Sequence, residues 1–208
     1  MVLSAGSGRE TTRRGTPADL LVVGLGNPGA EFEGTRHNVG GEAVALLASR
    51  HGVRLKRGRE RSLMAELRLD GRLLALAVPL TYMNESGEVL NHLVRRHGIE
   101  ELSRLVILHD ELDLPVGRVK VKVGGGLAGH NGLKSVKAHL HDDGFVRVRI
   151  GIGKPPGRQS GADFVLRRPS PADRAALDVA AEEAADAVET ILLEGPSTAM
   201  NRYNVSVP

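Results

Sequence analysis

The sequence contains no cysteine, no tryptophan and few aromatic residues of any kind. Without cysteine there can be no disulfide framework and no thiolate zinc site, and nothing indicates an oxidising compartment. No apolar run approaches the length of a membrane-spanning helix, and the first residues lack the apolar segment of a signal peptide. We therefore expect a cytoplasmic protein with no membrane partner.

The composition fits one globular domain. The 208 residues include 41% apolar and 25% charged side chains, which is enough for a sizeable core. The net charge is only +3, but arginine and lysine are concentrated in short stretches, which indicates a basic surface. Residues 1–18 are rich in Ser, Gly, Thr and Arg and have few large apolar side chains. We predict a flexible extension over residues 1–18 and a single domain over residues 19–208.

A glycine-rich turn follows the first apolar run. Leu20 to Val23 is typical of a buried strand, and the glycines of Gly24-Leu25-Gly26-Asn27-Pro28-Gly29 favour a tight turn with close backbone approach to a ligand. The turn matches the G-x-G-x-x-G dinucleotide fingerprint, but a helical pattern starts only near Val39. The acidic residue that should hold a ribose is also missing from Ser49-Arg50-His51. An oxidoreductase function therefore remains an alternative only if the protein binds a nicotinamide cofactor.

Strands alternate with helices along the rest of the chain, which predicts an α/β fold. Asp70-Gly71 between two apolar runs favours a hairpin with a type I′ turn. Ser170 followed by Pro171 is typical of a helix start. Strands are expected at Leu20–Val23, Leu63–Leu69, Arg72–Val78, Leu105–Leu108, Arg118–Val123 and Val146–Ile150, and helices from Val39 to near Gly52, from a Ser86 cap to near His97, through Lys134 and Lys137, and from Ser170 to about Leu193.

Polar side chains gather where three of these strands end. Asn27 and His37 follow the first strand, Asn84 follows the hairpin, and Asp110 follows the strand at Leu105. Ligand sites in α/β sheets lie beyond the carboxyl ends of the strands. A histidine, a carboxylate and amides suit a histidine base that activates water, although a single histidine or asparagine near a turn is more often structural.

Two further stretches display rows of cations. In Arg118-Val119-Lys120-Val121-Lys122-Val123 the strand period of two places all three cations on one face, and Val146-Arg147-Val148-Arg149-Ile150 has the same alternation. Two such strands form either ordinary amphipathic edges or a groove for a phosphate backbone. The basic run Arg54 to Arg61 has the same two interpretations, a solvated loop or a nucleic-acid contact.

Five motifs, in this order and spacing, resemble the bacterial peptidyl-tRNA hydrolase family. They are GLGNPGAEFEGTRHNVG, TYMNESG, HDELDLPVG, GGGLAGHNGLKSV and RVRIGIGKP, and the similarity covers Leu20 to Tyr203. The resemblance implies a single α/β domain with a mixed, twisted β-sheet flanked by helices. It implies hydrolysis of the ester between a peptide and the 3′ end of tRNA in prematurely released peptidyl-tRNA, by a monomer without a cofactor or metal.

The resemblance also implies a role for each matching position. His37 is similar to the histidine that activates water, and Asp110 to the aspartate that orients it. The implied substrate-binding residues are Asn27, Phe32, Tyr82, Met83, Asn84 and Asn131, and the implied tRNA phosphate-binding residues are Lys120, Lys122 and Arg149.

Two positions depart from the family pattern. Phe32 stands where the family usually has tyrosine, and Leu127-Ala128 stands where its mobile loop commonly has glycine or polar residues. Similar sequences in chloroplasts act as group II intron splicing factors, which bind a partner protein without obvious hydrolysis. Such an inert RNA-binding homologue is the second alternative, and the retention of His37, Asp110 and the three asparagines argues against it.

Overall fold

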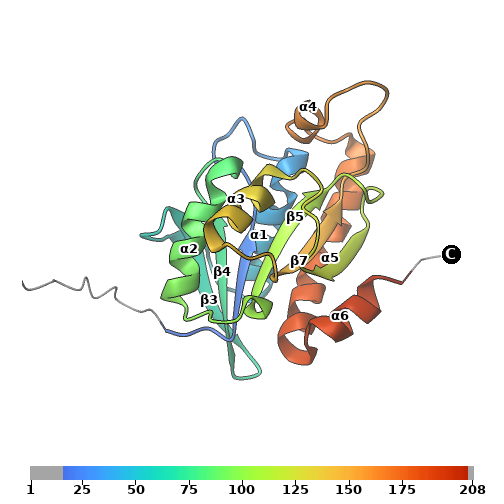
Figure 1. Cartoon of the computed structure of the whole chain (residues 1–208). Coiled ribbons are helices and arrows are strands. Elements are labelled where there is room, and N and C mark those ends of the chain that lie inside the picture. Colours follow the sequence, from blue (N-terminus) through green and yellow to red (C-terminus); the bar gives the residue numbers. More distant parts are fainter. Residues whose placement is uncertain (1–15, 206–208) are drawn as a thin grey trace, which may run out of the picture.

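A seven-stranded sheet forms the centre of the computed structural model, which describes residues 16–205 (Figure 1). Its strand order is β2-β3-β4-β1-β5-β7-β6. The strands are β1 (Leu20–Gly24), β2 (Lys56–Arg57), β3 (Ser62–Leu69), β4 (Arg72–Pro79), β5 (Leu105–Glu111), β6 (Val119–Val123) and β7 (Val146–Gly151). Strands β4, β1, β5 and β7 run parallel, and the strands at both edges are antiparallel to their neighbours. The mixed sheet confirms the predicted fold class.

Helices cover both faces of the sheet (Figure 1). Buried residues of α2 and α3 pack with one face, and those of α1, α5 and α6 pack with the other. The helices are α1 (Val39–Arg50), α2 (Ser86–Arg96), α3 (Asn131–Leu140), α4 (Gly161–Val165), α5 (Pro171–Glu194) and α6 (Pro196–Tyr203), with 3-10 turns at Arg36–Asn38, Met83–Glu85 and Leu102–Arg104. No helix within residues 16–205 is both long and apolar enough to cross a membrane.

Local signals in the sequence specify several elements correctly. All five residues of β1 are buried, as expected for a strand with neighbours on both sides and helices on both faces. Asp70 and Gly71 both have positive φ, 48° and 79°, which a type I′ turn requires. The Ser170 side chain accepts a hydrogen bond from the Asp173 N–H at the start of α5. These predictions are confirmed because each depends on residues adjacent in the chain.

Other boundaries differ from the predictions. Strand β5 continues to Glu111, so Asp110 lies within the strand and not beyond it. Ser86 is the first residue of α2 and does not cap it; its hydroxyl donates to the Met83 carbonyl oxygen instead. Lys56–Arg57 forms a short edge strand where a loop was expected. Arg118 precedes β6, and its guanidinium donates to the Tyr203 carbonyl oxygen at 3.4 Å, so it does not join the row of cations.

The predicted N-terminal extension lies mostly outside the described residues. Its last residue, Ala18, is 1% exposed, and its N–H donates to the His97 carbonyl oxygen at 3.0 Å. The extension and its boundary remain predictions.

Glycines of the first turn bring three backbones together. A Cβ atom on Gly24 would lie 2.3 Å from the Gly40 carbonyl oxygen, and one on Gly40 would lie 2.2 Å from the Leu108 carbonyl oxygen. The close approach at Gly24 is therefore to α1 and not to a ligand, which corrects the prediction. Helix α1 begins well after the turn, unlike the helix of a dinucleotide-binding fold.

Candidate active site

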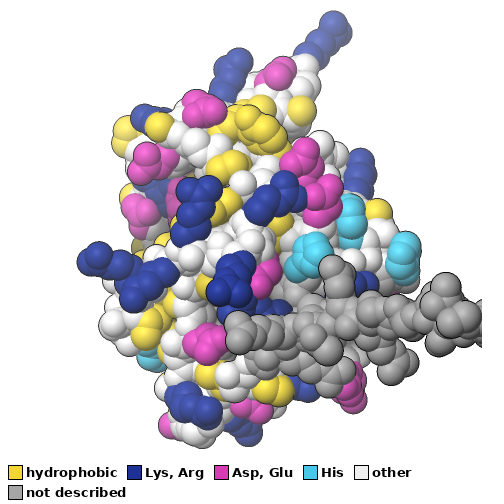
Figure 2. Space-filling view, turned by 90° about the vertical axis from the view of Figure 1, so that its left-hand side faces the viewer, with side chains coloured by type: hydrophobic (Ala, Val, Ile, Leu, Met, Phe, Trp, Pro, Cys, Tyr) yellow, Lys and Arg dark blue, Asp and Glu magenta, His cyan; other side chains and the backbone are white. Residues whose placement is uncertain are grey.

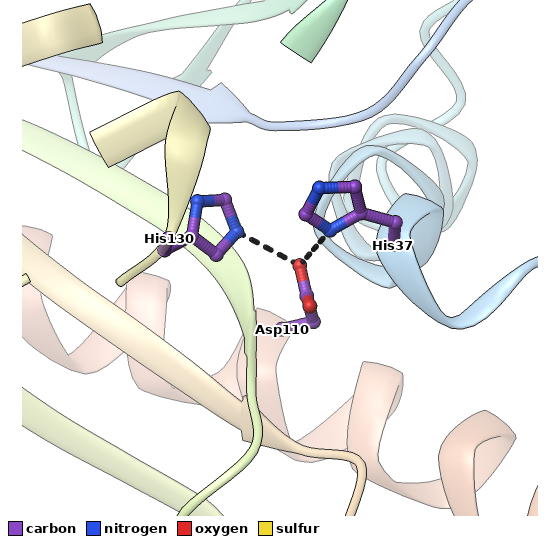
Figure 3. Close-up of side chains that lie close together, drawn as sticks. All are labelled: His37, Asp110 and His130. Atoms are coloured by element: carbon purple, nitrogen blue, oxygen red, sulfur yellow. Dashed lines mark hydrogen bonds and ion pairs between the residues drawn. The ribbon is translucent and has the colours of Figure 1, made fainter. Parts of the chain in front are cut away.

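His37 and Asp110 meet at the carboxyl end of the sheet (Figure 3). His37 lies in the 3-10 turn before α1, Asp110 lies near the end of β5, and both are less than 10% exposed. The His37 Nδ1 atom is 2.8 Å from Asp110 Oδ1. An ionised carboxylate can only accept, so Nδ1 carries the proton and Nε2 keeps its lone pair. Nε2 has no hydrogen-bond partner within residues 16–205 and is available to a ligand.

A second histidine, His130, binds the same carboxylate oxygen. Its Nε2 atom lies 2.9 Å from Asp110 Oδ1, while its Nδ1 accepts the Leu133 N–H at the start of α3. Because Nδ1 accepts this helix bond, His130 donates to the carboxylate from Nε2. Sequence reasoning assigned it no role. The available signal was its place immediately before Asn131, but only the fold brings it to Asp110.

Burial and hydrogen bonding act in opposite directions on Asp110. Burial by itself would raise the pKa of this carboxyl group, but the charges and hydrogen bonds of His130 and His37 outweigh it and hold the pKa well below its ordinary value. Neighbouring His109 is buried and packs against His130 with ring centroids 5.0 Å apart. Burial first, and then His130, lower the pKa of His109. The carboxylate is therefore the permanent negative charge of the cluster.

The same three residues have the composition of a metal site. The potential ligand atoms of His37, Asp110 and His130 lie within 4.8 Å of one another. However, His37 Nδ1 and His130 Nε2 both donate to the same carboxylate oxygen, so in this arrangement neither nitrogen has a lone pair directed at an ion. In this arrangement the cluster orients the two imidazoles.

Amide side chains line a cavity beside His37. It has a volume of about 280 Å³, and its walls include Asn27, Met83, Asn84 and Asn131. The structure thus brings the three predicted asparagines to one place. Asn27 Oδ1 accepts the Met83 N–H at 2.8 Å, which leaves the Asn27 amide N–H groups for other acceptors.

Asn38 holds the Asn27 loop in place. Its side-chain oxygen accepts the Asn27 N–H at 2.8 Å, and its side-chain nitrogen donates to the Asn27 carbonyl oxygen at 2.9 Å. No pattern in the sequence marks Asn38, because a paired contact across the turn is visible only in three dimensions.

A second cavity lies on the other side of the histidine. Its volume is about 230 Å³, and it is lined by Asp110, His130, Leu112 and Ala128 among others. The two cavities share His37, Asn131, Ala162 and Val165 in their walls. A ligand that occupies both cavities would therefore pass next to His37. Ala128, one of the departures from the family pattern, has a φ of 48°, a conformation that favours glycine.

Arg36 fixes the short helix α4 that completes both cavities. Its guanidinium donates to the carbonyl oxygens of Arg167 and Arg168 and pairs with Asp173 at 3.2 Å. The same group lies 4.2 Å from the centroid of the Phe164 ring. The residue next to the candidate base thus anchors the opposite wall, a function that the sequence did not suggest.

Phe32 and Tyr82 are placed differently from the other predicted substrate-binding residues. Neither belongs to the walls of the two cavities. Their rings pack edge to face with centroids 6.3 Å apart, and Tyr82 is 54% exposed. They form an aromatic pair in which Phe32 is half-buried and Tyr82 is exposed.

The predicted cations lie side by side on β6 and β7. Lys120 is opposite Arg149, and Lys122 is opposite Arg147, so all four start from one face of the sheet. Arg149 Nε donates to the buried Glu111 carboxylate at 3.0 Å, which orients its guanidinium. The two-row arrangement is as predicted for these positions, while their binding to phosphate remains a prediction.

Arg147 is not a surface cation. It is 1% exposed, and its guanidinium donates to the carbonyl oxygens of Gly124 and Gly126. Burial lowers the pKa of Arg147, and the charge of Arg149 lowers it further. Arg147 thereby anchors the start of the loop that leads to His130 and Asn131.

The fold and the site together define a class, an α/β enzyme with a carboxylate-oriented histidine at the carboxyl edge of its sheet. A family model described as peptidyl-tRNA hydrolase matches residues 21–208. The chain belongs to the peptidyl-tRNA hydrolase family.

Curated relatives and a crystal structure agree with this assignment. A peptidyl-tRNA hydrolase of Frankia casuarinae is 49% identical over 184 residues, covering 88% of this chain and 93% of the relative. One of Mycobacterium tuberculosis is 48% identical over 186 residues, covering 89% and 97%. The crystal structure of the Acinetobacter baumannii peptidyl-tRNA hydrolase is similar with a TM-score of 0.84 and 34% identity, covering 91% of this chain and 96% of that chain.

Proposed function

We propose that the protein hydrolyses the ester between a peptide and the 3′ end of tRNA, and that His37 activates the attacking water. The observation that carries this proposal is the position of His37. Its Nδ1 is held by a buried carboxylate, and its Nε2 is available where two cavities meet. A positioned histidine with an unprotonated nitrogen is suited to act as a general base near neutral pH.

The reaction follows from this geometry. His37 Nε2 takes a proton from water while the water oxygen attacks the ester carbon, and Asp110 stabilises the imidazolium that forms. The tetrahedral intermediate collapses as the bond to the 3′ oxygen breaks. The imidazolium returns its proton to that oxygen, which leaves a free peptide acid and a tRNA with its 3′ hydroxyl restored.

Amide groups are placed to stabilise the negative charge on the intermediate. Asn27, Asn84 and Asn131 line the cavity next to His37, and Asn131 is also the first residue of α3. The first N–H groups of a helix lack partners within the helix and carry partial positive charge. Donors aimed at a developing oxyanion account for a large part of the rate of acyl transfer.

The two cavities suit the two halves of such a substrate. The cavity beside His130 and Leu112 lies toward β5, which neighbours the cationic strands β7 and β6, so we assign it to the terminal nucleotide. The cavity beside Asn27 and Met83 lies toward β1 and β4, so we assign it to the peptide. We also propose that the enzyme works as a monomer in the cytoplasm, where its substrate is formed.

Activity on a simple substrate tests the proposal. Purified protein is expected to release the blocked amino acid from N-acetyl-aminoacyl-tRNA in the presence of EDTA, because no step above needs a metal ion. Release is measured from acid-precipitable counts. Tight binding of tRNA without release would instead support the inert RNA-binding alternative, and release that requires added metal would contradict the mechanism.

The cations of β6 and β7 give a separate prediction. Lys122→Ala is expected to weaken tRNA binding and to reduce the slope of log affinity against log salt by about one, because one phosphate contact is lost. Turnover of a minimal ester without a tRNA body should change less. Arg68→Ala, which removes an exposed cation at the opposite end of the sheet, is the matched control.

Arg149→Ala is expected to act in the same direction as Lys122→Ala. It also removes the partner of the buried Glu111 carboxylate, so its thermal stability must be compared with that of the parent. If the salt dependence of tRNA binding is unchanged in both variants, Lys122 and Arg149 do not bind the tRNA phosphate.

A further inference from the structure

Arg57, the last residue of β2, and residues 58–61 after it lie at the edge of the sheet opposite to β6, and we call this segment the edge loop. Ser62 pairs with Pro79, so the edge loop lies at the carboxyl end of β4, the end that carries Asn84. The Leu80 N–H donates to the Arg61 carbonyl oxygen at 2.7 Å, and the Gly58 N–H closes the turn on the Ser62 carbonyl oxygen at 2.7 Å. The edge loop is therefore tied directly to the segment that forms the peptide cavity.

The edge loop presents positive charge to solvent. Arg57, Arg59 and Arg61 are exposed, and the first two form no ion pair with any residue in the range 16–205. Arg61 pairs with Glu88 on the surface, and the single acidic residue of the loop, Glu60, is already paired with Arg96 of α2. Figure 2 shows lysine and arginine side chains over much of this side of the molecule, with acidic groups between them.

The parts of the site follow the strand order across the sheet. The cations of β6 and β7 lie at one edge, Asp110 lies near the end of β5, and Asn27 and His37 follow β1. The edge loop lies at the far edge beyond β4. Six strand spacings separate the two edges, or roughly 29 Å. A substrate with its phosphate at β6 and its ester at His37 has its peptide directed toward the edge loop.

The distance from the peptide cavity sets which peptide residues reach the loop. Strands β4 and β2 are two strand spacings apart, or about 10 Å. An extended peptide covers this distance in roughly three residues. The exposed Tyr82 lies in the segment between, so the path starts along an aromatic surface.

We propose that the edge loop binds acidic side chains of the peptide, about three to five residues from the ester, and makes acidic peptides preferred substrates. This inference rests on the proposed function, because it takes the ester position from it. The guanidinium groups of Arg57, Arg59 and Arg61 provide donors that match carboxylates. A phosphate held at β6 lies six strand spacings from this loop, whereas the peptide cavity lies about two strand spacings from it, so we assign the loop to the peptide.

The test compares two peptidyl-tRNAs that share one tRNA and one C-terminal amino acid. One peptide has Asp and the other has Lys at the third to fifth positions from the ester. For the parent enzyme at low salt, KM is expected to be about three- to tenfold lower for the acidic peptide, since each exposed charge pair contributes only weakly. The difference should shrink at high salt, with little change in kcat.

The triple variant Arg57→Gln, Arg59→Gln, Arg61→Gln is expected to abolish the difference between the two peptides. The matched control is Arg54→Gln, an exposed arginine of the same run that lies before β2 and away from the carboxyl edge. Thermal unfolding of both variants checks that the loop changes leave the fold intact.

Each other outcome is informative. If the triple variant raises KM equally for both peptides, the loop contacts tRNA and the proposal is wrong. If the parent hydrolyses both substrates with equal KM, the proposal is wrong while the proposed function stands. If neither substrate is hydrolysed, the proposed function fails, and the affinities of the two peptidyl-tRNAs still decide whether the loop selects acidic peptides.

Discussion

Replacement of His37 by alanine is expected to lower kcat for peptidyl-tRNA hydrolysis by about 10²- to 10⁴-fold, the usual contribution of a general base. KM should change much less, because the cavities that hold the substrate are formed mainly by other residues. The variant should fold, since the lost side chain is small and lies at the wall of a cavity. Single-turnover release of peptide measures the loss directly.

His92→Ala is the matched control for this experiment. It removes an exposed imidazole from α2 and is expected to keep the parent kcat. Full activity of His37→Ala, in protein whose thermal unfolding matches the parent, would contradict the proposed mechanism.

Asp110→Asn is expected to lower kcat by about 10²- to 10⁴-fold, as His37→Ala does. The amide has nearly the shape of the carboxylate but no charge, so it cannot stabilise the imidazolium formed when His37 takes a proton. Its NH₂ group can also donate to His37 Nδ1, which would leave the proton on Nε2 and remove the base. Asp113→Asn, which changes an exposed carboxylate of the same motif, should leave the rate unchanged.

The lowered pKa of Asp110 also predicts how stability depends on pH. Because the folded pKa lies below the unfolded value of about 3.9, ionised Asp110 stabilises the fold above that pH. This contribution is lost as the pH falls through the folded pKa. Between pH 5 and 8 the carboxylate stays charged, so titration of Asp110 makes no contribution to the pH dependence of activity in this range. Chemical unfolding at several pH values should show a smaller acid dependence in Asp110→Asn than in the parent.

Much of the fold follows from signals that are local in the chain. The buried run at β1, the Asp70-Gly71 turn and the Ser170 cap each specify their element through neighbouring residues, and the structure agrees. The meeting of His37 with Asp110 was also predictable, although 73 positions separate them. It follows from the rule that parallel strands bring their carboxyl ends together, and the resemblance to a family selected the residues.

The remaining features depend on contacts that no local pattern encodes. His130 bonds to Asp110 only because α3 starts at the edge of β5, and Arg147 is buried only because a glycine loop folds back over it. The alternation of β7 correctly placed Arg147 on the cationic face, but alternation cannot tell whether such a side chain reaches solvent. Helix α4 is too short for a periodic signal and depends on Arg36 for its position.

The backbone contact of Gly24, Gly40 and Leu108 determines the distance between the catalytic side chains. Gly40 lies three positions after His37, and Leu108 lies two positions before Asp110, so this backbone contact fixes how near the two side chains can come. A single added methyl group would wedge helix and strand apart by more than the tolerance of a hydrogen bond. The positions that tolerate little exchange of amino acids therefore include Gly24 and Gly40, which have no side chain and take no part in the reaction.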